Sequence, residues 1–324
     1  MLILSGEDVK QVLDIAELFE ALKEGFRLLA EGQWKVPLRT AIDISNDEGV
    51  ALFMPAYCEG LTAAGVKLVT VMSGNREKNL PLIHSVYVYL SAQTGQIKSL
   101  MDAEVLTGVR TATTSVLVAD LAGKSSGRVL AIFGTGVQAW FHVEAFTKLF
   151  SISEVLVYGH TPDLSEEFAV RIERQFRMPA RRAVMAELKR ADLICTCTTS
   201  PDPVFEWKDI RPGVHITGVG SYRPNTREIG TQVVKNSAVI VDSYEGALHE
   251  AGDIVIPINE GAIPRHHIYA SIAELVSGAK QAPHDQGKTT LFKSLGMALE
   301  DLVAADLAYR KAVSKGIGKE VRLS

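Results

Sequence analysis

A glycine turn directly after a short apolar segment constrains the fold of this chain more than any other feature. Residues 129–133 are all apolar, and a helical pattern follows the turn through residue 146. The turn itself reads Gly134-Thr135-Gly136-Val137-Gln138-Ala139. Between a strand and a helix, Gly134 permits the tight turn, Gly136 lets the backbone approach a pyrophosphate, and Ala139 lets the helix pack close to the strand. Because a helix N-terminus also offers free N–H groups to phosphates, the pattern predicts a dinucleotide-binding turn.

An ordinary glycine-rich connection would explain the turn if it stood alone, so the segments that follow it matter. Short and mostly apolar segments alternate there with helical ones. The expected strands are residues 129–133, 154–158, 192–196, 214–219 and 238–241. Alternation of this kind is typical of a parallel sheet covered by helices. We therefore predict an α/β fold with a Rossmann-type, doubly wound parallel sheet.

The region before the turn has a different periodicity. Residues 9–31 have apolar side chains at helical spacing, which predicts one amphipathic opening helix. Residues 39–101 contain short segments of period two, which predict a largely antiparallel sheet with a hairpin near residues 94–95. The remaining expected elements are helices over residues 104–121 and 289–315 and a polar connection over residues 123–127. The sequence thus predicts a second domain of the α+β type.

Composition narrows the class of partner. A length of 324 residues favours two domains. The 34 Lys and Arg against 38 Asp and Glu give a net charge of −4, so nothing points to nucleic acid or an acidic membrane surface, and we expect a small-molecule partner. Three cysteines are too few for a disulfide framework or a zinc site, which fits a cytoplasmic protein without a metal. Residues 1–20 resemble neither a signal peptide nor a membrane span.

The end of the second expected strand bears on which nicotinamide dinucleotide fits. An acid at this position holds the ribose 2′-hydroxyl of NAD in many such folds. Here residues 159–162 read Gly-His-Thr-Pro, and the first acid is Asp163. The missing acid leaves room for a 2′-phosphate, so NADPH is favoured over NADH, and both remain open. Candidate contacts to the phosphate are His160, Thr161 and either Arg181 or Arg182.

The loop after the strand at residues 192–196 carries several hydroxyl groups. Residues 197–201 read Cys-Thr-Thr-Ser-Pro, at the end of a strand where open parallel sheets bind ligands. The hydroxyls either line a cofactor cleft or satisfy backbone groups of the turn. Cys195 and Cys197 lack two further metal ligands, and we expect them to be buried strand cysteines.

Three cations lie among apolar or small neighbours in the region before the turn: Arg39, Lys67 and Arg110. A buried cation costs free energy unless it is paired or binds an anion. One interpretation is a carboxylate pocket, in which guanidinium groups make two parallel hydrogen bonds and the lysine adds a charge or a proton. The other is that each cation reaches water or pairs with an acid, for which the candidates are Asp43, Glu59 and Glu104.

Five segments carry a family resemblance. They are residues 106–112 (Leu-Thr-Gly-Val-Arg-Thr-Ala), 133–139, 219–224 (Val-Gly-Ser-Tyr-Arg-Pro), 250–253 (Glu-Ala-Gly-Asp) and 288–296 (Lys-Thr-Thr-Leu-Phe-Lys-Ser-Leu-Gly). Together and in this order, they resemble the ornithine cyclodeaminase/mu-crystallin family. The resemblance implies a homodimer, with a substrate-binding and dimerisation domain over residues 1–118 and 296–324 and an NAD(P)-binding Rossmann domain over residues 119–295.

The resemblance also implies roles for single residues. Arg39, Lys67 and Arg110 match the family's substrate-contacting cations. Arg39 and Arg110 would hold a carboxylate, and Lys67 would either supply a proton or act only as an electrostatic anchor. Beside the glycine turn, the residues that match contacts to the dinucleotide are Val137, Gln138, Thr198, Val219, Gly220, Ser221 and Ser294.

Two departures separate this chain from the cyclodeaminases. Those enzymes resemble this sequence around residues 220–224 but carry an aspartate where it has Tyr222, and they carry a second acid where it has Leu52. Without these carboxylates, no residue is in place to deprotonate a terminal ammonium for ring closure. Leu52, Met54 and Tyr222 instead suit a carbon ring in the substrate site.

The segment around Tyr222 is similar to reductases of 1-pyrroline-2-carboxylate in the same family. We therefore predict an NAD(P)H-dependent oxidoreductase that reduces a cyclic 2-carboxy imine, either 1-pyrroline-2-carboxylate to L-proline or 1-piperideine-2-carboxylate to L-pipecolate. The alternatives are an ornithine cyclodeaminase, an alanine dehydrogenase that uses pyruvate and ammonia, and a binding protein that holds the dinucleotide without turnover.

Overall fold

The computed structural model describes residues 1–44, 49–283 and 287–322. It divides into a first unit, Met1–Arg110 with Met297–Ser324, and a second unit, Thr111–Gly296. The division falls inside helix α3 (Ala103–Leu121), whereas the polar residues 123–127 form the expected connection, from α3 to β8 (Val129–Phe133) within the second unit. The reason is that α3 is continuous: Thr107 is hydrogen-bonded to Lys67 of the first unit, whereas Ser115 is hydrogen-bonded to His142 of the second.

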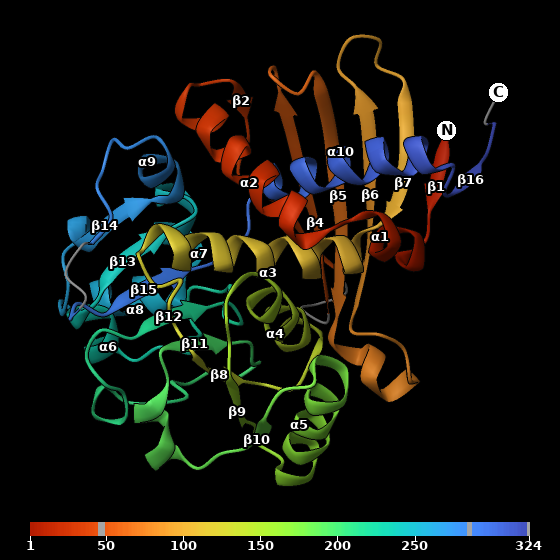
Figure 1. Ribbon diagram of the computed structural model, residues 1–324. Helices are drawn as coiled ribbons and strands as arrows, with labels where there is room; N and C mark the ends of the chain where they lie inside the picture. Colours follow the sequence, from red (N-terminus) through yellow and green to blue (C-terminus); the bar gives the residue numbers. More distant parts are fainter. Residues whose placement is uncertain (45–48, 284–286, 323–324) are drawn as a thin grey trace. The chain divides into compact units, whose positions relative to one another are not determined.

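The second unit is built on one parallel sheet, with the strand order β10-β9-β8-β11-β12-β15-β13-β14 (Figure 1). Every strand pair in it is parallel. The chain order reverses between β8 and β11, and ligands of doubly wound sheets bind at the carboxyl ends of the strands at such a reversal. The predicted Rossmann-type fold is confirmed. The strands are β8 (Val129–Phe133), β9 (Glu154–Tyr158), β10 (Ala180–Arg182), β11 (Leu193–Thr196), β12 (His215–Gly218), β13 (Ala238–Val241), β14 (Ile268–Ser271) and β15 (Thr290–Lys293).

Helices connect these strands. The α-helices are α4 (Val137–Leu149), α5 (Pro162–Phe176), α6 (Thr231–Asn236), α7 (Tyr244–Glu250), α8 (Gly252–Asn259) and α9 (Ile272–Val276). The described residues also form four short 3-10 helices. They are η1 (Ser73–Lys78) in the first unit, and η2 (Met185–Arg190), η3 (Trp207–Asp209) and η4 (Arg265–His267) in the second.

One expected helix in this region is wrong in part. Residues 289–315 were predicted to be helical, but Thr290–Lys293 form strand β15 between β12 and β13, and helix α10 begins only at Ala298. All four residues of β15 are buried. A short apolar segment that is buried on both sides has no alternation, so its periodicity does not distinguish a strand from a helix.

The first unit is built on a mostly antiparallel sheet with the order β16-β1-β7-β6-β5-β4-β2, and β3 pairs with β4. Only β1 and β7 run parallel among the described strands of this sheet. The predicted hairpin is confirmed, because β6 and β7 pair on either side of Gly95, whose φ is 71°. The strands are β1 (Leu2–Leu4), β2 (Trp34–Lys35), β3 (Thr40–Ile44), β4 (Gly49–Cys58), β5 (Ala63–Met72), β6 (Ile83–Ser91), β7 (Ile97–Asp102) and β16 (Lys319–Glu320).

Helix α10 (Ala298–Lys315) crosses one face of this sheet beside helix α2 (Ile15–Ala30), as Figure 1 shows. The opening helix differs from the prediction, because α2 is preceded by a separate helix, α1 (Gly6–Val12). Asp14 breaks the pattern: its carboxylate accepts hydrogen bonds from the N–H groups of Ala16 and Glu17 and so caps the N-terminus of α2.

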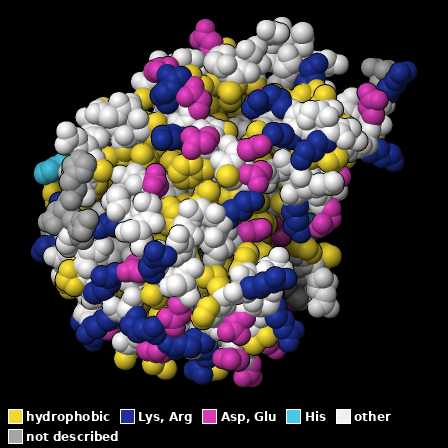
Figure 2. Space-filling model, in the orientation of Figure 1, with side chains coloured by type: hydrophobic (Ala, Val, Ile, Leu, Met, Phe, Trp, Pro, Cys, Tyr) yellow, Lys and Arg dark blue, Asp and Glu magenta, His cyan; other side chains and the backbone are white. Residues whose placement is uncertain are grey.

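The surface visible in Figure 2 mixes charges of both signs. Lys and Arg side chains alternate with Asp and Glu, so the described residues on this face form no large patch of a single sign. None of the described helices is both long enough and apolar enough to cross a membrane.

Candidate functional site

The backbone conformation and the close packing of the chain require a glycine at the first position of the turn. Gly134 follows β8 with a φ of 104°, a conformation that side chains rarely adopt. A Cβ at this position would collide with the carbonyl oxygen of Cys197, which follows β11. Gly134 therefore lets the ends of β8 and β11 approach each other at the point where the strand order reverses.

Nothing in the described part of the chain requires a glycine at the second position of the turn. Gly136 caps the N-terminus of α4 without a side chain, and a Cβ there would meet no heavy atom within 4 Å. The neighbouring Val137 is 51% exposed, and the Oε1 atom of Gln138 is buried without a hydrogen-bond partner among the described residues. Ala139 is fully buried, as expected. A helix start without a side-chain cap, beside an open position, fits the pyrophosphate of a dinucleotide.

The end of β9 presents polar side chains to solvent. His160 and Thr161 are exposed, and Thr161 is the N-cap residue of α5 without a side-chain hydrogen bond. Arg181, one candidate for a 2′-phosphate contact, is held by Glu187 and by Glu154 at the opposite end of β9. Arg182 is exposed at the end of β10 and remains the better basic candidate.

The loops after β11 and β12 lie against each other. A Cβ at Gly220 would collide with the carbonyl oxygen of Thr198. The Thr198 hydroxyl donates to Glu228 (2.7 Å) and accepts from the N–H of Ser200 (3.0 Å). The bond from Ser200 is the kind that the second interpretation, in which the hydroxyls satisfy backbone groups of the turn, predicts.

The residue that follows β15 is hydrogen-bonded to the end of β12, beside these loops. The N–H of Ser294 donates to the carbonyl of Gly218 (3.0 Å), and the hydroxyl of Ser221 donates to the carbonyl of Thr226 (2.6 Å). The structure thus brings together, at the carboxyl ends of β11, β12 and β15, the predicted cofactor residues Thr198, Val219, Gly220, Ser221 and Ser294. Tyr222 follows on the same loop with 36% of its surface exposed, and the Arg223 guanidinium lies 5.6 Å from its ring centroid.

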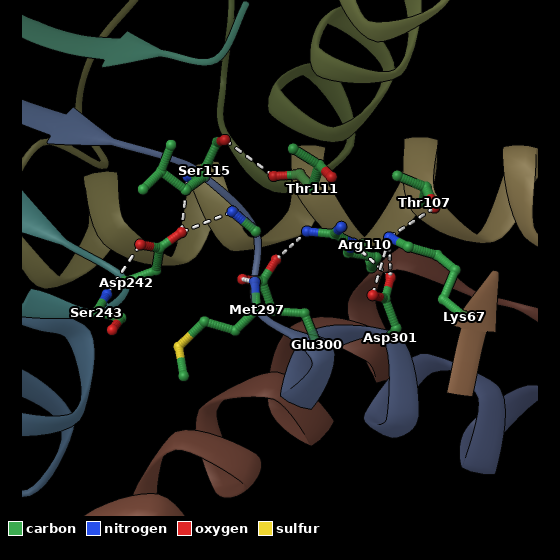
Figure 3. Close-up of polar contacts among 12 residues, drawn as sticks. Lys67, Thr107, Arg110, Thr111, Ser115, Asp242, Ser243, Met297, Glu300 and Asp301 are labelled. Carbon is green, nitrogen blue, oxygen red and sulfur yellow. Dashed lines mark hydrogen bonds and ion pairs between the residues drawn. The ribbon is translucent and has the colours of Figure 1, made fainter. Parts of the chain in front are cut away.

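Four buried charged residues hold these loops, and the sequence reasoning missed their role. They are Glu228, Asp242, Asp253 and Lys293. Asp242, for example, accepts hydrogen bonds from the N–H groups of Leu295 and Gly296 at 2.7 Å each (Figure 3 labels Asp242). The sequence held a signal for two of them, because Asp242 directly follows the apolar residues 238–241 and Lys293 directly follows the apolar residues 291–292.

A second cluster of buried charges lies in the first unit (Figure 3). Lys67 on β5 is 3% exposed, and its Nζ atom lies 3.0 and 2.9 Å from the two carboxylate oxygens of Asp301. Arg110 on α3 donates from Nε to Asp301 (2.9 Å) and from Nη1 to Glu300 (2.6 Å). Two of the predicted substrate-binding cations, Lys67 and Arg110, are therefore brought together by one shared carboxylate.

The acids of this cluster were not among the expected partners. We named Asp43, Glu59 and Glu104 as alternatives, but the partners are Glu300 and Asp301, in the first turn of α10. Glu300 also accepts the N–H of Met297 (2.9 Å), which fixes the helix start. A visible signal was the pair of acids inside the otherwise apolar and small residues 297–305. Lys67 and Arg110 are therefore each paired with an acid, as the second interpretation predicts, but with Glu300 and Asp301 in place of the acids we named.

The cluster changes the acid–base properties of its members. Burial lowers the pKa of Lys67 to about 8, although the charge of Asp301 opposes the shift. Burial alone would lower the pKa of Arg110 too, but Asp301 and Glu300 raise it above its ordinary value, so Arg110 stays charged. The Nη2 atom of Arg110 makes no hydrogen bond with any residue that the structure describes. That edge of the guanidinium can accept a further anion.

Arg39 lies one strand away from this cluster. It directly precedes β3 and is half-buried. Thr40 pairs with Phe53 of β4, and the next residue of β4, Met54, pairs with Lys67. Arg39, next to β3, and Lys67, on β5, therefore lie on either side of β4, which also carries the buried Leu52. No group of three potential metal ligands occurs within residues 1–44, 49–283 and 287–322.

Comparison with known proteins shows which family this chain belongs to. A sequence model of the ornithine cyclodeaminase/mu-crystallin family matches residues 1–316. The chain belongs to this family. It is 32% identical over 324 residues to a Delta(1)-pyrroline-2-carboxylate reductase of Bacillus cereus, with 99% of each chain covered. It is 36% identical over 310 residues to the ketimine reductase mu-crystallin of Mus musculus, covering 94% of this chain and 96% of that one.

A solved relative agrees in fold over the whole chain. The structure of Thermococcus litoralis Delta(1)-pyrroline-2-carboxylate reductase in complex with NADH and L-proline matches with a TM-score of 0.92 and 34% identity, covering 99% of this chain and 100% of that one. The relatives are named as reductases and dehydrogenases. The prediction of an oxidoreductase of this family is confirmed.

Proposed function

We propose that this chain is an NAD(P)H-dependent reductase of a cyclic imine that carries a carboxylate on the imine carbon. The first substrate is 1-pyrroline-2-carboxylate, which gives L-proline, and the second is 1-piperideine-2-carboxylate, which gives L-pipecolate. The observation that carries the proposal is the buried cluster of Lys67, Arg110 and Asp301, which places a guanidinium beside an amine whose pKa burial lowers to about 8. The names of the relatives support the choice of substrate.

Arg110 binds the substrate carboxylate in this proposal. Its Nε and Nη1 atoms are fixed by Asp301 and Glu300, which leaves Nη2 as the donor to the substrate. Because both acids orient a planar group, the donor is held in place before the substrate arrives. Arg39, from the strand beyond β4, is the second contact to the carboxylate.

The dinucleotide supplies a hydride to the imine carbon when it is bound. The glycine turn, from Gly134 to Ala139, takes the pyrophosphate, and the loops after β11, β12 and β15 take the nicotinamide end. As the hydride forms the new C–H bond, the C=N π electrons move to nitrogen, which has to carry a proton. Lys67, as an ammonium, supplies that proton directly or through a water and is recharged from solvent.

The pH dependence of turnover tests the role of Lys67. Its pKa of about 8 means that the ammonium form is lost as the pH rises, so kcat/KM should fall roughly tenfold per pH unit above pH 8. In Lys67→Arg the side chain stays charged, so the limb near pH 8 should vanish and the rate should drop about a hundredfold. A limb that stays at the same pH in the variant belongs to the titration of the imine itself, and Lys67 is then an anchor only.

The substrate set separates this proposal from its alternatives. Purified protein should oxidise NADPH or NADH with 1-pyrroline-2-carboxylate, more slowly with 1-piperideine-2-carboxylate, and without a measurable rate when no substrate is present. The buried Leu52 and Met54 and the absence of an acid at Tyr222 predict no release of ammonia from ornithine. Oxidation with pyruvate and ammonia, but with neither imine, would make the chain an alanine dehydrogenase and refute the proposal.

The choice of dinucleotide is part of the proposal. The exposed His160 and Thr161 and the exposed Arg182 favour a 2′-phosphate, and no carboxylate stands at the end of β9 to repel it. We therefore expect a higher kcat/KM with NADPH than with NADH. Equal values for both would remove this preference without touching the reaction.

The proposal also includes a homodimer in the cytoplasm. Lys67 and Tyr89 face α10, because they contact Asp301 and Asp306. Strand side chains alternate, so the opposite face carries the side chains in between. These are apolar and only half-buried: Val66, Leu68, Val86, Val88 and Leu100. An apolar sheet face of this kind suits a second copy of the chain, and light scattering would give its mass.

A further inference from the structure

One buried carboxylate joins the loops at the ends of β11 and β12. Glu228 is fully buried, and its two oxygens accept four hydrogen bonds. Oε1 accepts from the N–H and the hydroxyl of Thr198, at 2.7 Å each. Oε2 accepts from the hydroxyl of Thr196 (2.9 Å) and from the N–H of Gly220 (2.6 Å). Each oxygen thus binds a backbone N–H from a different loop.

Glu228 is itself held from the other side. Asp253 accepts the N–H groups of Glu228 and Ile229 at 2.8 Å each, and its other oxygen lies 2.9 Å from Nζ of Lys293. Lys293 in turn donates to the carbonyls of Gly218 (3.2 Å) and Ser221 (2.5 Å). The carboxylate that joins the two loops is therefore fixed in position by a second acid and a lysine from β15.

Burying these charged groups costs free energy, and formation of the fold does not by itself require them. Burying two carboxylates with one lysine is expensive, and apolar side chains of similar size hold many protein interiors as well or better. Here every hydrogen bond to the Glu228 side chain comes from the carboxyl ends of β11 and β12, where doubly wound sheets bind their ligands. The network therefore sets the distance between two ligand-binding loops.

We propose that Glu228 is a positioning residue for the nicotinamide end of the dinucleotide. By holding Thr198 and Gly220 at a fixed separation, it shapes the surface against which the nicotinamide ring lies, while the glycine turn at Gly134 holds the pyrophosphate independently. The proposal rests on the proposed function, since it needs a nicotinamide dinucleotide to bind. It predicts that damage to Glu228 weakens binding of the nicotinamide half and spares the remainder of the cofactor.

The test compares NADH with ADP-ribose, which lacks the nicotinamide, by calorimetric titration of the full-length protein. In Glu228→Gln the amide nitrogen faces the N–H of Thr198 or the N–H of Gly220, whichever way the side chain lies, so one loop is released. The Kd for NADH should rise about tenfold or more, whereas the Kd for ADP-ribose should stay within about twofold. Thr196→Val removes one hydroxyl donor and should raise the NADH Kd by about threefold.

The control is Glu274→Gln, which removes the charge from another carboxylate of the same unit with comparable hydrogen bonds, to Ser271 and Tyr244. It should leave both Kd values unchanged. Equal weakening of NADH and ADP-ribose in Glu228→Gln, or no weakening of NADH, overturns the proposal. If that variant does not fold, an unchanged ratio of the two Kd values in Thr196→Val overturns it. Failure of the unaltered protein to bind NADH, NADPH and ADP-ribose is a different result, because it refutes the proposed function.

Discussion

Replacing Arg110 with lysine should lower kcat/KM for 1-pyrroline-2-carboxylate by about a hundredfold or more, with little change in the affinity for the dinucleotide. An ammonium keeps the charge, but it is a point donor and cannot bind Asp301, Glu300 and the substrate carboxylate in the fixed directions of a guanidinium. Steady-state kinetics over a range of imine concentrations, together with NADH titration, measures both effects.

Arg310→Lys is the matched control for this variant. Arg310 pairs with Asp306 on α10, in the same unit, but is 61% exposed at its side chain. We expect its replacement to leave kcat/KM within about twofold, since exposed ion pairs contribute little. Arg110→Ala should abolish turnover as well, but it also leaves Glu300 and Asp301 buried without their partner, so the lysine variant is the cleaner test. Normal turnover in Arg110→Lys would reject a role for Arg110 in binding the carboxylate.

Replacing Asp301 with asparagine should have the largest effect on stability. Asp301 accepts hydrogen bonds from both Lys67 and Arg110, and removing its charge leaves two buried cations facing one acid. Breaking a buried pair in this way costs about 3–5 kcal/mol, so the melting temperature should fall by roughly 10 °C. Thermal unfolding followed by circular dichroism measures the change.

The same variant should shift the pH profile in a defined direction. The charge of Asp301 raises the pKa of Lys67 against the effect of burial, and the result is about 8. Without that charge the pKa falls further, so the decline of kcat/KM should begin at a lower pH. Asp306→Asn is the control, because Asp306 lies on the same helix but binds Tyr89 and Arg310. An unchanged pH profile in Asp301→Asn would separate Lys67 from proton transfer.

Local patterns in the sequence were enough for much of the fold. The strands β8, β9 and β13 have the predicted bounds, because each is a short apolar segment next to a turn. The predictions failed where a local pattern is ambiguous. The fully buried β15 has no alternation that marks it as a strand, and the break between α1 and α2 depends on the single capping side chain of Asp14.

Local sequence patterns were also insufficient to predict the charged residues of the candidate site and their partners. Lys67 and Arg110 stood out in the sequence because cations are rare in apolar surroundings. Their partners did not, because Asp301 lies 234 residues from Lys67 along the chain, and no local rule connects a strand residue with the start of a distant helix. Glu228 was missed for a related reason: its hydrogen-bond donors come from loops after two other strands, which only the assembled sheet brings together.

Transfer of deuteride tests the central claim most directly. Purified protein is incubated with 1-pyrroline-2-carboxylate and NADPH or NADH that carries deuterium at the transferable C4 position, and the product is examined by NMR and chiral chromatography. The proposed function predicts L-proline with one deuterium at the carbon that bears the carboxylate and no deuterium elsewhere. Formation of no proline, or of proline without the label at that carbon, would contradict it.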